Sequence, residues 1–388
     1  MSNPKELLKK TEEVFNRHFK SVPSFYKAPG RINLIGEHTD YNDGFVLPAS
    51  IDKAIYFAVA KNNNGKLRFY STNYEELFES DANDIRQSKV AWANYLLGVL
   101  AQFEKKGFSG QGIDCAFGGD IPYGAGLSSS AALECGFALC VNDVYAADLD
   151  RKLLALMAQK AEHEFAGVMC GIMDQFTSLF GKQESVIKLD CRDLNYEYYP
   201  FNSADIDIVL CDTRVKHSLA SSEYNQRRAE CEKGVSLLKE RHPEVKSLRD
   251  AGPEMLETVR EKMNATVYAR CSYVIEEIRR VENACKALLQ NDFTKFGKLM
   301  FETHNGLSRD YGVSCKELDV LADIAGRDGN VLGARMMGGG FGGCTINLVK
   351  RQGTDRFIND IKSGYSRATG IETDVFTVQI SEGAGKII

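Results

Sequence analysis

The chain has 388 residues, of which 44% are hydrophobic and 26% are charged, and its formal net charge is −5 at pH 7. This length favours two domains over a single core, and an acidic balance without a long Lys/Arg run argues against a nucleic-acid-binding protein. No uncharged apolar stretch is long enough to span a bilayer, so a soluble, cytoplasmic protein without membrane partners is expected.

The eleven cysteines include no C-x-x-C pair and share no ligand spacing with the six histidines. Reduced, mostly buried thiols are therefore expected in place of disulfides.

The elements expected in the first half start with an amphipathic helix that ends near residue 19, followed by a strand that breaks into a polar loop at 25–45. The pattern then predicts strands at 46–61, 66–72 and 112–122, helices at 93–107, 129–145 and 153–168, and a hairpin at 185–201. The second half begins with a strand at 205–213 and is richer in helices (222–241, 273–290, 293–310). It closes with 331–350, where a Gly-rich turn joins to a strand, then a further helix and the last strand at 374–380. Because strands and helices interleave without strict alternation, the fold class is α+β, and a boundary near 205 divides it into domains 1–205 and 206–388.

Residues 122–133, PYGAGLSSSAAL, combine a Gly-rich turn with a helix start. Gly124 and Gly126 allow positive φ and close approach of a ligand, and the free N–H groups of the helix favour an anion such as a nucleotide phosphate. A serine-capped helix after a tight turn is the alternative. Since the loop has no lysine, a metal such as Mg²⁺ is the natural source of charge. Ser130 and either Glu162 or Glu164 could bind it, although both glutamates could simply be solvated.

A second stretch, PGRINLIGEHTDYNDG, places Arg31 shortly before Glu37, His38 and Asp40. Side chains that donate and accept hydrogen bonds in such a cluster suit sugar hydroxyls, and a charged turn at the end of a strand is the alternative.

In the third stretch Asp174 stands at a helix start after Gly171, where a helix cap is the alternative role. A fourth stretch, MMGGGFGGCT, has too many glycines for an ordinary turn and predicts a backbone that lies close to a ligand or to another loop.

Together these stretches resemble the galactokinase family, within the sugar, mevalonate and homoserine kinases called GHMP kinases. GRINLIGEHTDYNDG is similar to the galactokinase signature, GAGLSSSA to the GHMP phosphate loop and GGGFGGC to the third GHMP motif. Their order and separations match as well, so the resemblance covers essentially the whole chain. It implies a two-domain α+β fold with the active site in the cleft between the domains.

The activity that the resemblance implies is transfer of the γ-phosphoryl group of ATP to the anomeric hydroxyl of α-D-galactose, with Mg²⁺ as cofactor. Arg31 and Asp174 match the catalytic pair: Arg31 would stabilise charge in the transition state, and Asp174 would act as a base or orient the hydroxyl. The matching sugar contacts are Glu37, His38, Thr39, Asp40, Gly171, Asp174 and Tyr224. The matching phosphate contacts are Gly124, Ala125, Gly126, Leu127, Ser128, Ser129 and Ser130. Ser130 and Glu162 match the metal ligands, which decides against Glu164.

Two other functions are alternatives: an N-acetylgalactosamine kinase, and a non-catalytic sensor of galactose and ATP that resembles the family but tends to carry an altered serine loop. The intact serine loop with Arg31 and Asp174 favours catalysis, and glucose is expected to be rejected. Trp92 and Tyr95 are candidates for walls near the nucleotide, with core packing as the alternative. A monomer is expected, although the sequence does not exclude an oligomer.

Overall fold

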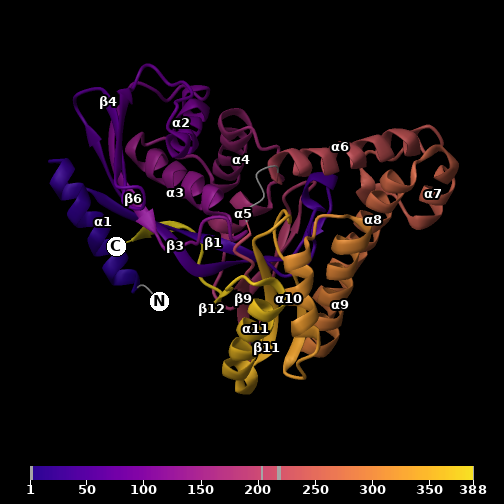
Figure 1. Ribbon diagram of the computed structural model, residues 1–388. Coiled ribbons are helices and arrows are strands. Elements are labelled where there is room, and N and C mark those ends of the chain that lie inside the picture. Colours follow the sequence, from indigo (N-terminus) through magenta and orange to yellow (C-terminus); the bar gives the residue numbers. More distant parts are fainter. Residues whose placement is uncertain (1–2, 202–203, 216–219, 388) are drawn as a thin grey trace.

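The computed structural model describes residues 3–201, 204–215 and 220–387, and Figure 1 shows two lobes that meet at the middle of the molecule. The N-terminal lobe contains a six-stranded sheet with the strand order β13-β1-β3-β6-β4-β5. Its strands are β1 (Ser24–Asn33), β3 (Pro48–Asn62), β4 (Lys66–Ser71), β5 (Glu76–Asp81), β6 (Gly112–Gly119) and β13 (Gly385–Ile387). The central strand β3 is buried along almost its whole length, because helices cover both faces of the sheet.

One face of this sheet is covered by α1 (Pro4–His18), whose Phe15 packs with Ala58 and Ala116. The helices of the other face carry much of the site and are α2 (Ala91–Glu104), α3 (Ser129–Val144), α4 (Arg151–Ala161) and α5 (Met173–Phe180). A short π-helix, Glu162–Ala166, continues α4.

The C-terminal lobe contains a four-stranded antiparallel sheet with the order β10-β11-β9-β12. The apolar side chains of Leu321 and Ile361 pack against Val209 and Val349 of this sheet. Its elements are β9 (Ile206–Asp212), α9 (Phe293–Asn305), α10 (Lys316–Gly326), β10 (Val331–Met336), β11 (Cys344–Lys350), α11 (Thr354–Thr369) and β12 (Asp374–Val378).

A small sheet and an arm of helices complete the molecule. The small sheet joins β2 (Phe45–Val46), β7 (Ser185–Asp190) and β8 (Tyr196–Pro200), and β7 with β8 forms the hairpin expected at 185–201. The arm, on the right of Figure 1, consists of α6 (Ala220–Lys239), α7 (Pro253–Glu257) and α8 (Ala265–Leu289). The α+β class is thereby confirmed.

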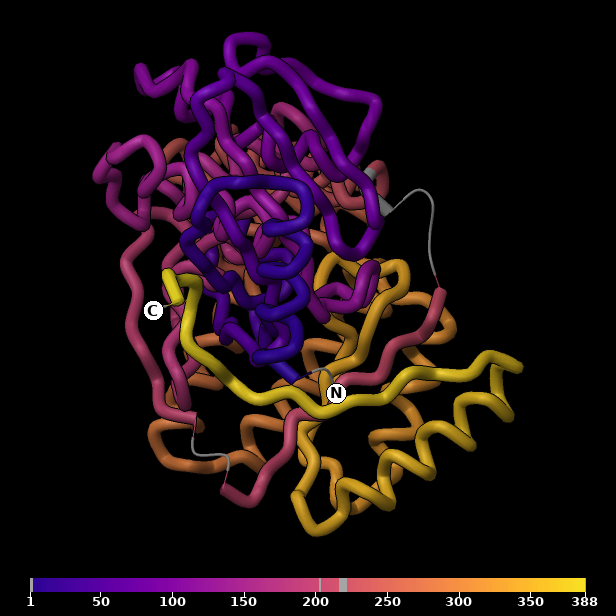
Figure 2. The backbone as a smooth tube through the Cα atoms, turned by 90° about the vertical axis from the view of Figure 1, so that its left-hand side faces the viewer, coloured from indigo at the N-terminus to yellow at the C-terminus, as the bar shows by residue number. Residues whose placement is uncertain are grey.

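The expected closing strand at 374–380 is not the last one. Beyond β12 the chain crosses back to the N-terminal lobe, where β13 pairs with β1, as the yellow end of the tube in Figure 2 shows. On the way, Ser381 N–H donates to Ser50 O (2.9 Å) and Ala384 N–H to Ser178 O (2.7 Å). The sequence gives no sign of β13, since three residues are too few to show a period.

Among the described residues, no helix combines the length and apolarity that crossing a membrane requires. All eleven cysteines are free thiols, and eight of them are buried.

Candidate active site

Arg31 and Asp174, which are 143 positions apart, form a bidentate ion pair (Nε–Oδ1 2.7 Å, Nη2–Oδ2 2.8 Å). Arg31 follows a β-bulge in β1, and Asp174 lies in the first turn of α5. The Arg31 side chain is 5% exposed and that of Asp174 24%. Burial opposes the charge of Arg31, but the neighbouring Asp174 and Glu37 outweigh it and raise the pKa of the guanidinium. The pair is therefore held in a fixed arrangement, and about a quarter of the Asp174 side chain stays exposed.

The serine loop lies directly against this pair. Arg31 also donates to Gly126 O through Nη1, its backbone N–H donates to Leu127 O (3.1 Å), and the Ser128 hydroxyl donates to the Asp174 carboxylate. Ser128 precedes α3 in the left-handed region (φ 59°), and its side chain makes no capping hydrogen bond. The first N–H groups of this 16-residue helix are thus free of a side-chain cap and can bind an anion.

The third glycine motif packs on the serine loop, which confirms one of the two roles expected for it. A Cβ on Gly126 would lie 3.1 Å from Met337 O, and one on Gly343 would lie 3.4 Å from Gly124 O. Gly343 has a φ of +79°, a conformation that glycine adopts readily. Only a motif with so little side chain allows the two loops to touch along their backbones.

One pocket collects most of the expected sugar contacts beside the ion pair. Thr39 is not among the lining residues, because its hydroxyl is buried and directed to the carbonyls of Gly36 (2.9 Å) and Phe45 (2.6 Å). The lining residues, one arginine and four carboxylates among them, are Arg31, Glu37, His38, Asp40, Glu162, Val168, Cys170, Gly171, Met173, Asp174, Tyr224, Gly338 and Gly339.

Burial governs the protonation states of Asp40 and His38 in this pocket. Burial, reinforced by the charge of Asp174, raises the pKa of Asp40 to about 7. Burial also lowers the pKa of His38 to about 3, so its imidazole is neutral at physiological pH. Near neutral pH these two residues therefore offer polar groups at low charge, which can exchange hydrogen bonds with an uncharged polyol.

Glu37 is held from both lobes. Its Oε2 accepts from Asn33 Nδ2 (2.9 Å), and its Oε1 accepts from Gly338 N–H (2.7 Å) and from Arg335 (3.3 Å). Arg335 is fully buried and also donates to Leu34 O (2.8 Å) and Met336 O (2.6 Å). This network joins the run expected to bind the sugar, in one lobe, to the glycine motif of the other lobe.

Ser130 and Glu162 face each other, whereas Glu164 does not take part. Ser130 Oγ donates to Glu162 Oε1 (3.1 Å), while Glu164 pairs with Lys105 (2.5 Å) on another side of the helix. Burial and the nearby Asp174 raise the pKa of Glu162. Glu134 lies behind this pair, and its buried Oε1 has no hydrogen-bond partner among the described residues.

These oxygens fit a hard divalent cation, although no group of three or more His, Cys, Asp or Glu side chains in the described ranges is arranged as a metal site. Mg²⁺ needs only one or two protein ligands when nucleotide phosphates and waters supply the others.

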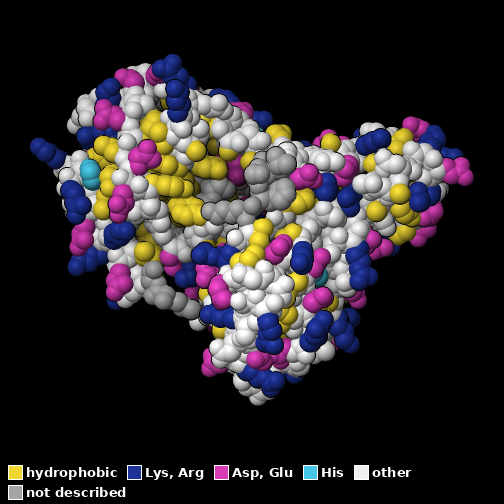
Figure 3. All heavy atoms as spheres, viewed as in Figure 1, with side chains coloured by type: hydrophobic (Ala, Val, Ile, Leu, Met, Phe, Trp, Pro, Cys, Tyr) yellow, Lys and Arg dark blue, Asp and Glu magenta, His cyan; other side chains and the backbone are white. Residues whose placement is uncertain are grey.

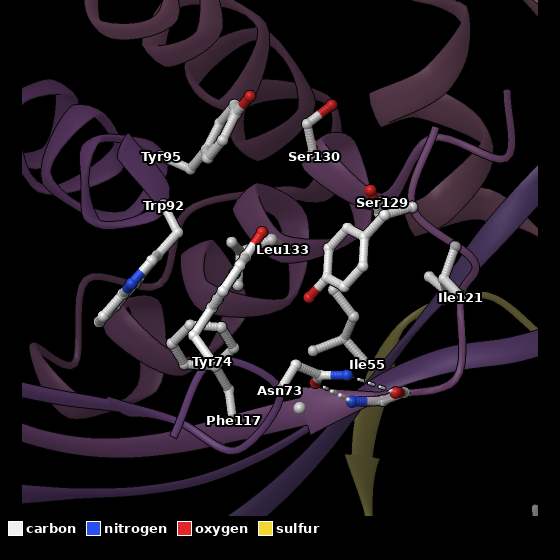
Figure 4. Close-up of a pocket in the computed structure, with 13 residues that line it drawn as sticks. Ile55, Asn73, Tyr74, Trp92, Tyr95, Phe117, Ile121, Ser129, Ser130 and Leu133 are labelled. Carbon is white, nitrogen blue, oxygen red and sulfur yellow. Dashed lines mark hydrogen bonds between the residues drawn. The ribbon is translucent and has the colours of Figure 1, made fainter. Parts of the chain in front are cut away.

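An aromatic pocket opens beside the serine loop, and Figure 4 shows its walls. Trp92 and Tyr95 of α2 face Tyr74, and Ser129 and Ser130 close the side toward the serine loop. Trp92 is nearly buried and donates through Nε1 to Glu76 (2.7 Å), so it contributes to both core and pocket. In Figure 3, hydrophobic side chains gather around a hollow on this lobe. A flat heterocycle fits such walls.

Sequence reasoning missed several residues of these sites. Tyr74 lies in the turn between β4 and β5. Tyr123 also lines the pocket, and its ring centroid lies 5.7 Å from that of Tyr74. No local sequence pattern predicts the contact between Tyr74 and Tyr123. Glu134 could have been found, because it follows Ser130 by four positions and hence shares its helix face.

The sequence matches the same family in comparisons with family models and with known proteins. Family models match residues 13–61 (galactokinase galactose-binding signature), 94–182 (GHMP kinases N terminal domain) and 284–366 (GHMP kinases C terminal). The chain is similar to a galactokinase of Roseiflexus sp., with 38% identity over 97% of this chain and 96% of the relative. A galactokinase of Thermotoga maritima is 41% identical over 93% of this chain and 99% of its own length.

Among solved structures, Lactococcus lactis galactokinase complexed with galactose superposes with a TM-score of 0.94 at 34% identity and covers 99% of both chains. A mevalonate kinase with a TM-score of 0.64 and 17% identity, covering 92% of this chain and 99% of its own, shares the fold.

Proposed function

This chain belongs to the galactokinase family of GHMP kinases, and we propose that its own Arg31 and Asp174 carry the transfer of the γ-phosphoryl group of ATP to the anomeric hydroxyl of α-D-galactose. The observation that supports this assignment is the bidentate Arg31–Asp174 pair between the free N-terminus of α3 and a pocket of sugar-binding groups. The products are α-D-galactose 1-phosphate and ADP.

In the proposed mechanism, Asp174 accepts the hydrogen bond of the anomeric hydroxyl and thereby directs its oxygen at the γ-phosphorus. A new P–O bond forms to this oxygen while the bond between the β–γ bridging oxygen and the γ-phosphorus breaks, and the hydroxyl proton passes to Asp174. Arg31 fixes the carboxylate, since both of its hydrogen bonds to Asp174 are short and well formed. In this proposal its guanidinium also stabilises the charge that develops on the transferred group, which lowers the barrier electrostatically.

The two substrates occupy adjacent sites in this proposal. Galactose hydroxyls contact Glu37, His38, Asp40 and Tyr224, while adenine enters the aromatic pocket beside Trp92. The triphosphate lies along the serine loop and the N–H groups of α3. Ser130 and Glu162 would hold Mg²⁺, which when bound shares the charge of the phosphates.

We also place the reaction in the cytoplasm, where ATP is available and the free thiols stay reduced.

A phosphorus NMR time course tests the proposed function. Purified protein is incubated with Mg·ATP and, in parallel, with galactose, N-acetylgalactosamine, glucose or no sugar. A new sugar 1-phosphate resonance with galactose and not with glucose is expected. If N-acetylgalactosamine alone gave a product, that sugar would be the substrate in place of galactose. A protein that binds ATP and galactose without forming any product would be a sensor.

A further inference from the structure

A chain of hydrogen bonds runs from His38 away from the sugar pocket into the C-terminal lobe. His38 Nδ1 lies 2.7 Å from the Tyr41 hydroxyl, which lies 2.7 Å from the Tyr311 hydroxyl. The Tyr311 hydroxyl in turn lies 3.3 Å from Cys231 Sγ. Tyr311 and Cys231 are almost completely buried, and neither belongs to the proposed contacts with sugar or nucleotide. The arrangement links one ring nitrogen of a sugar-binding histidine to a series of interior donors.

The direction of donation follows from the chemistry of the groups. Burial raises the pKa of both Tyr41 and Tyr311 well above the usual phenol range, so each keeps its proton. A phenol O–H is a strong donor and an imidazole nitrogen a good acceptor, whereas a thiol is weak in either role. We therefore expect Tyr311 to donate to Tyr41 and Tyr41 to His38 Nδ1. A neutral imidazole with an accepting Nδ1 carries its hydrogen on Nε2.

The surroundings of His38 keep this ring in place. Its backbone has a φ of +62°, and Asn42 Nδ2 donates to its carbonyl (2.9 Å). The ring packs against Tyr311 (4.9 Å between centroids) and Tyr224 (5.4 Å). His38 is 4% exposed, and its buried Nε2 makes no hydrogen bond of normal geometry in the part of the chain that the structure describes, although the backbone of Gly339 lies close enough to the ring to favour its protonated form. An unpaired buried N–H in a sugar-binding pocket is costly unless a ligand satisfies it.

We propose that Tyr41 and Tyr311 are positioning residues that fix the ring and the tautomer of His38, so that its Nε2–H donates to a hydroxyl oxygen of the bound sugar. The identity of that sugar rests on the proposed function, whereas the tautomer does not. Without the Tyr41 hydroxyl, Nδ1 loses its donor, both tautomers become accessible, and a fraction of the molecules presents an acceptor to the sugar. The loss of one oriented hydrogen bond should weaken galactose binding by about tenfold.

The experiment uses the full-length protein with ¹⁵N in its histidine rings and long-range ¹H–¹⁵N correlation spectra. His38 is identified as the signal set that disappears in His38→Gln. In the wild type we expect a protonated Nε2 and an unprotonated, hydrogen-bonded Nδ1. Tyr41→Phe should shift the Nδ1 signal towards a tautomer mixture and raise the calorimetric Kd for galactose about tenfold, and Tyr311→Phe should do the same to a smaller extent.

Tyr365→Phe is the matched control, because it removes an equally buried phenol hydroxyl that donates to Thr213 O (2.8 Å) outside this chain of hydrogen bonds. It should leave the His38 signals and the galactose Kd unchanged. A wild-type proton on Nδ1 would overturn the proposal, as would Tyr41→Phe with unaltered His38 signals, whatever its affinity. If Tyr41→Phe fails to fold, the wild-type spectrum and the spectrum of Tyr311→Phe still test whether Nε2 of His38 carries the hydrogen. If the wild type bound no galactose, the proposed function would fail while the spectra still reported the tautomer.

Discussion

Replacing Gly171 by alanine tests whether the Asp40 carboxylate forms the sugar site. Gly171 has a φ that any residue can adopt, but a Cβ built there would overlap the Asp40 carboxylate. Asp40 would then move out of its position, where Tyr41 N–H now donates to its Oδ1 (3.0 Å). A hydrogen bond to a charged group contributes about 1.5–3 kcal/mol. Losing one such contact should therefore weaken galactose binding by about 10- to 150-fold.

Calorimetry with galactose and the galactose KM at saturating Mg·ATP measure this effect, and the KM for Mg·ATP should stay within about twofold of the wild type. Gly329→Ala is the control, because that glycine also has an ordinary φ and an added Cβ would meet nothing within 4 Å. Far-UV circular dichroism checks that both variants are folded. A folded Gly171→Ala protein with wild-type galactose affinity would refute the role given to Asp40.

The catalytic pair, the expected metal ligands, the aromatic pocket and Asp40 can each be tested as well. Asp174→Asn should lower turnover by about 10²–10⁴-fold in an ADP-release assay while calorimetry still detects galactose binding, and near-normal turnover would exclude Asp174 from the chemistry. Ser130→Ala and Glu162→Gln should each raise the Mg²⁺ concentration needed for half-maximal rate, and an unchanged Mg²⁺ requirement would remove both from the metal site. Trp92 is the single tryptophan of the chain, so its fluorescence should respond to Mg·ADP and not to galactose alone; a silent signal with nucleotide would argue against the aromatic pocket. Burial raises the pKa of Asp40 to about 7, so galactose affinity should fall as pH decreases below 7 because the acceptor becomes protonated, and Asp40→Asn should lose this dependence. The same raised pKa affects the ligand-free protein. As pH rises from about 4 to about 7, the contribution of Asp40 to the free energy of unfolding decreases, because the folded state retains a proton that the unfolded chain releases.

The sequence predicted local features well because these features have local causes. The positive-φ glycines, the helix start after Ser128 and the position of Asp174 in the first turn of α5 all depend on neighbouring residues. The resemblance to a family then supplied the pairing of Arg31 with Asp174, which no spacing rule could give across 143 positions. Glu134 lay within reach of a helical spacing argument and was still overlooked.

The contacts that join the two lobes could not be predicted from the sequence. Arg335 donates to Leu34 O from 301 positions away, and its burial is visible only after both lobes are folded. In the sequence it is one charged residue in an apolar strand. The Tyr41–Tyr311 contact, which spans 270 positions, is hidden for the same reason.

The charges of the site explain how the serine loop works without a lysine. Arg31 is already neutralised by Asp174, and the same pocket holds the carboxylates of Asp40 and Glu162. A triphosphate would bring several more negative charges to this place. The N–H groups of α3 offset part of that charge through their dipoles, and Arg31 responds to the charge that develops during transfer. In the proposed function the remainder comes from a cation that enters with the nucleotide, for which Ser130 and Glu162 would supply oxygens. Free ATP should therefore be a poor substrate, and adding Mg²⁺ should raise the rate until the nucleotide is saturated with metal.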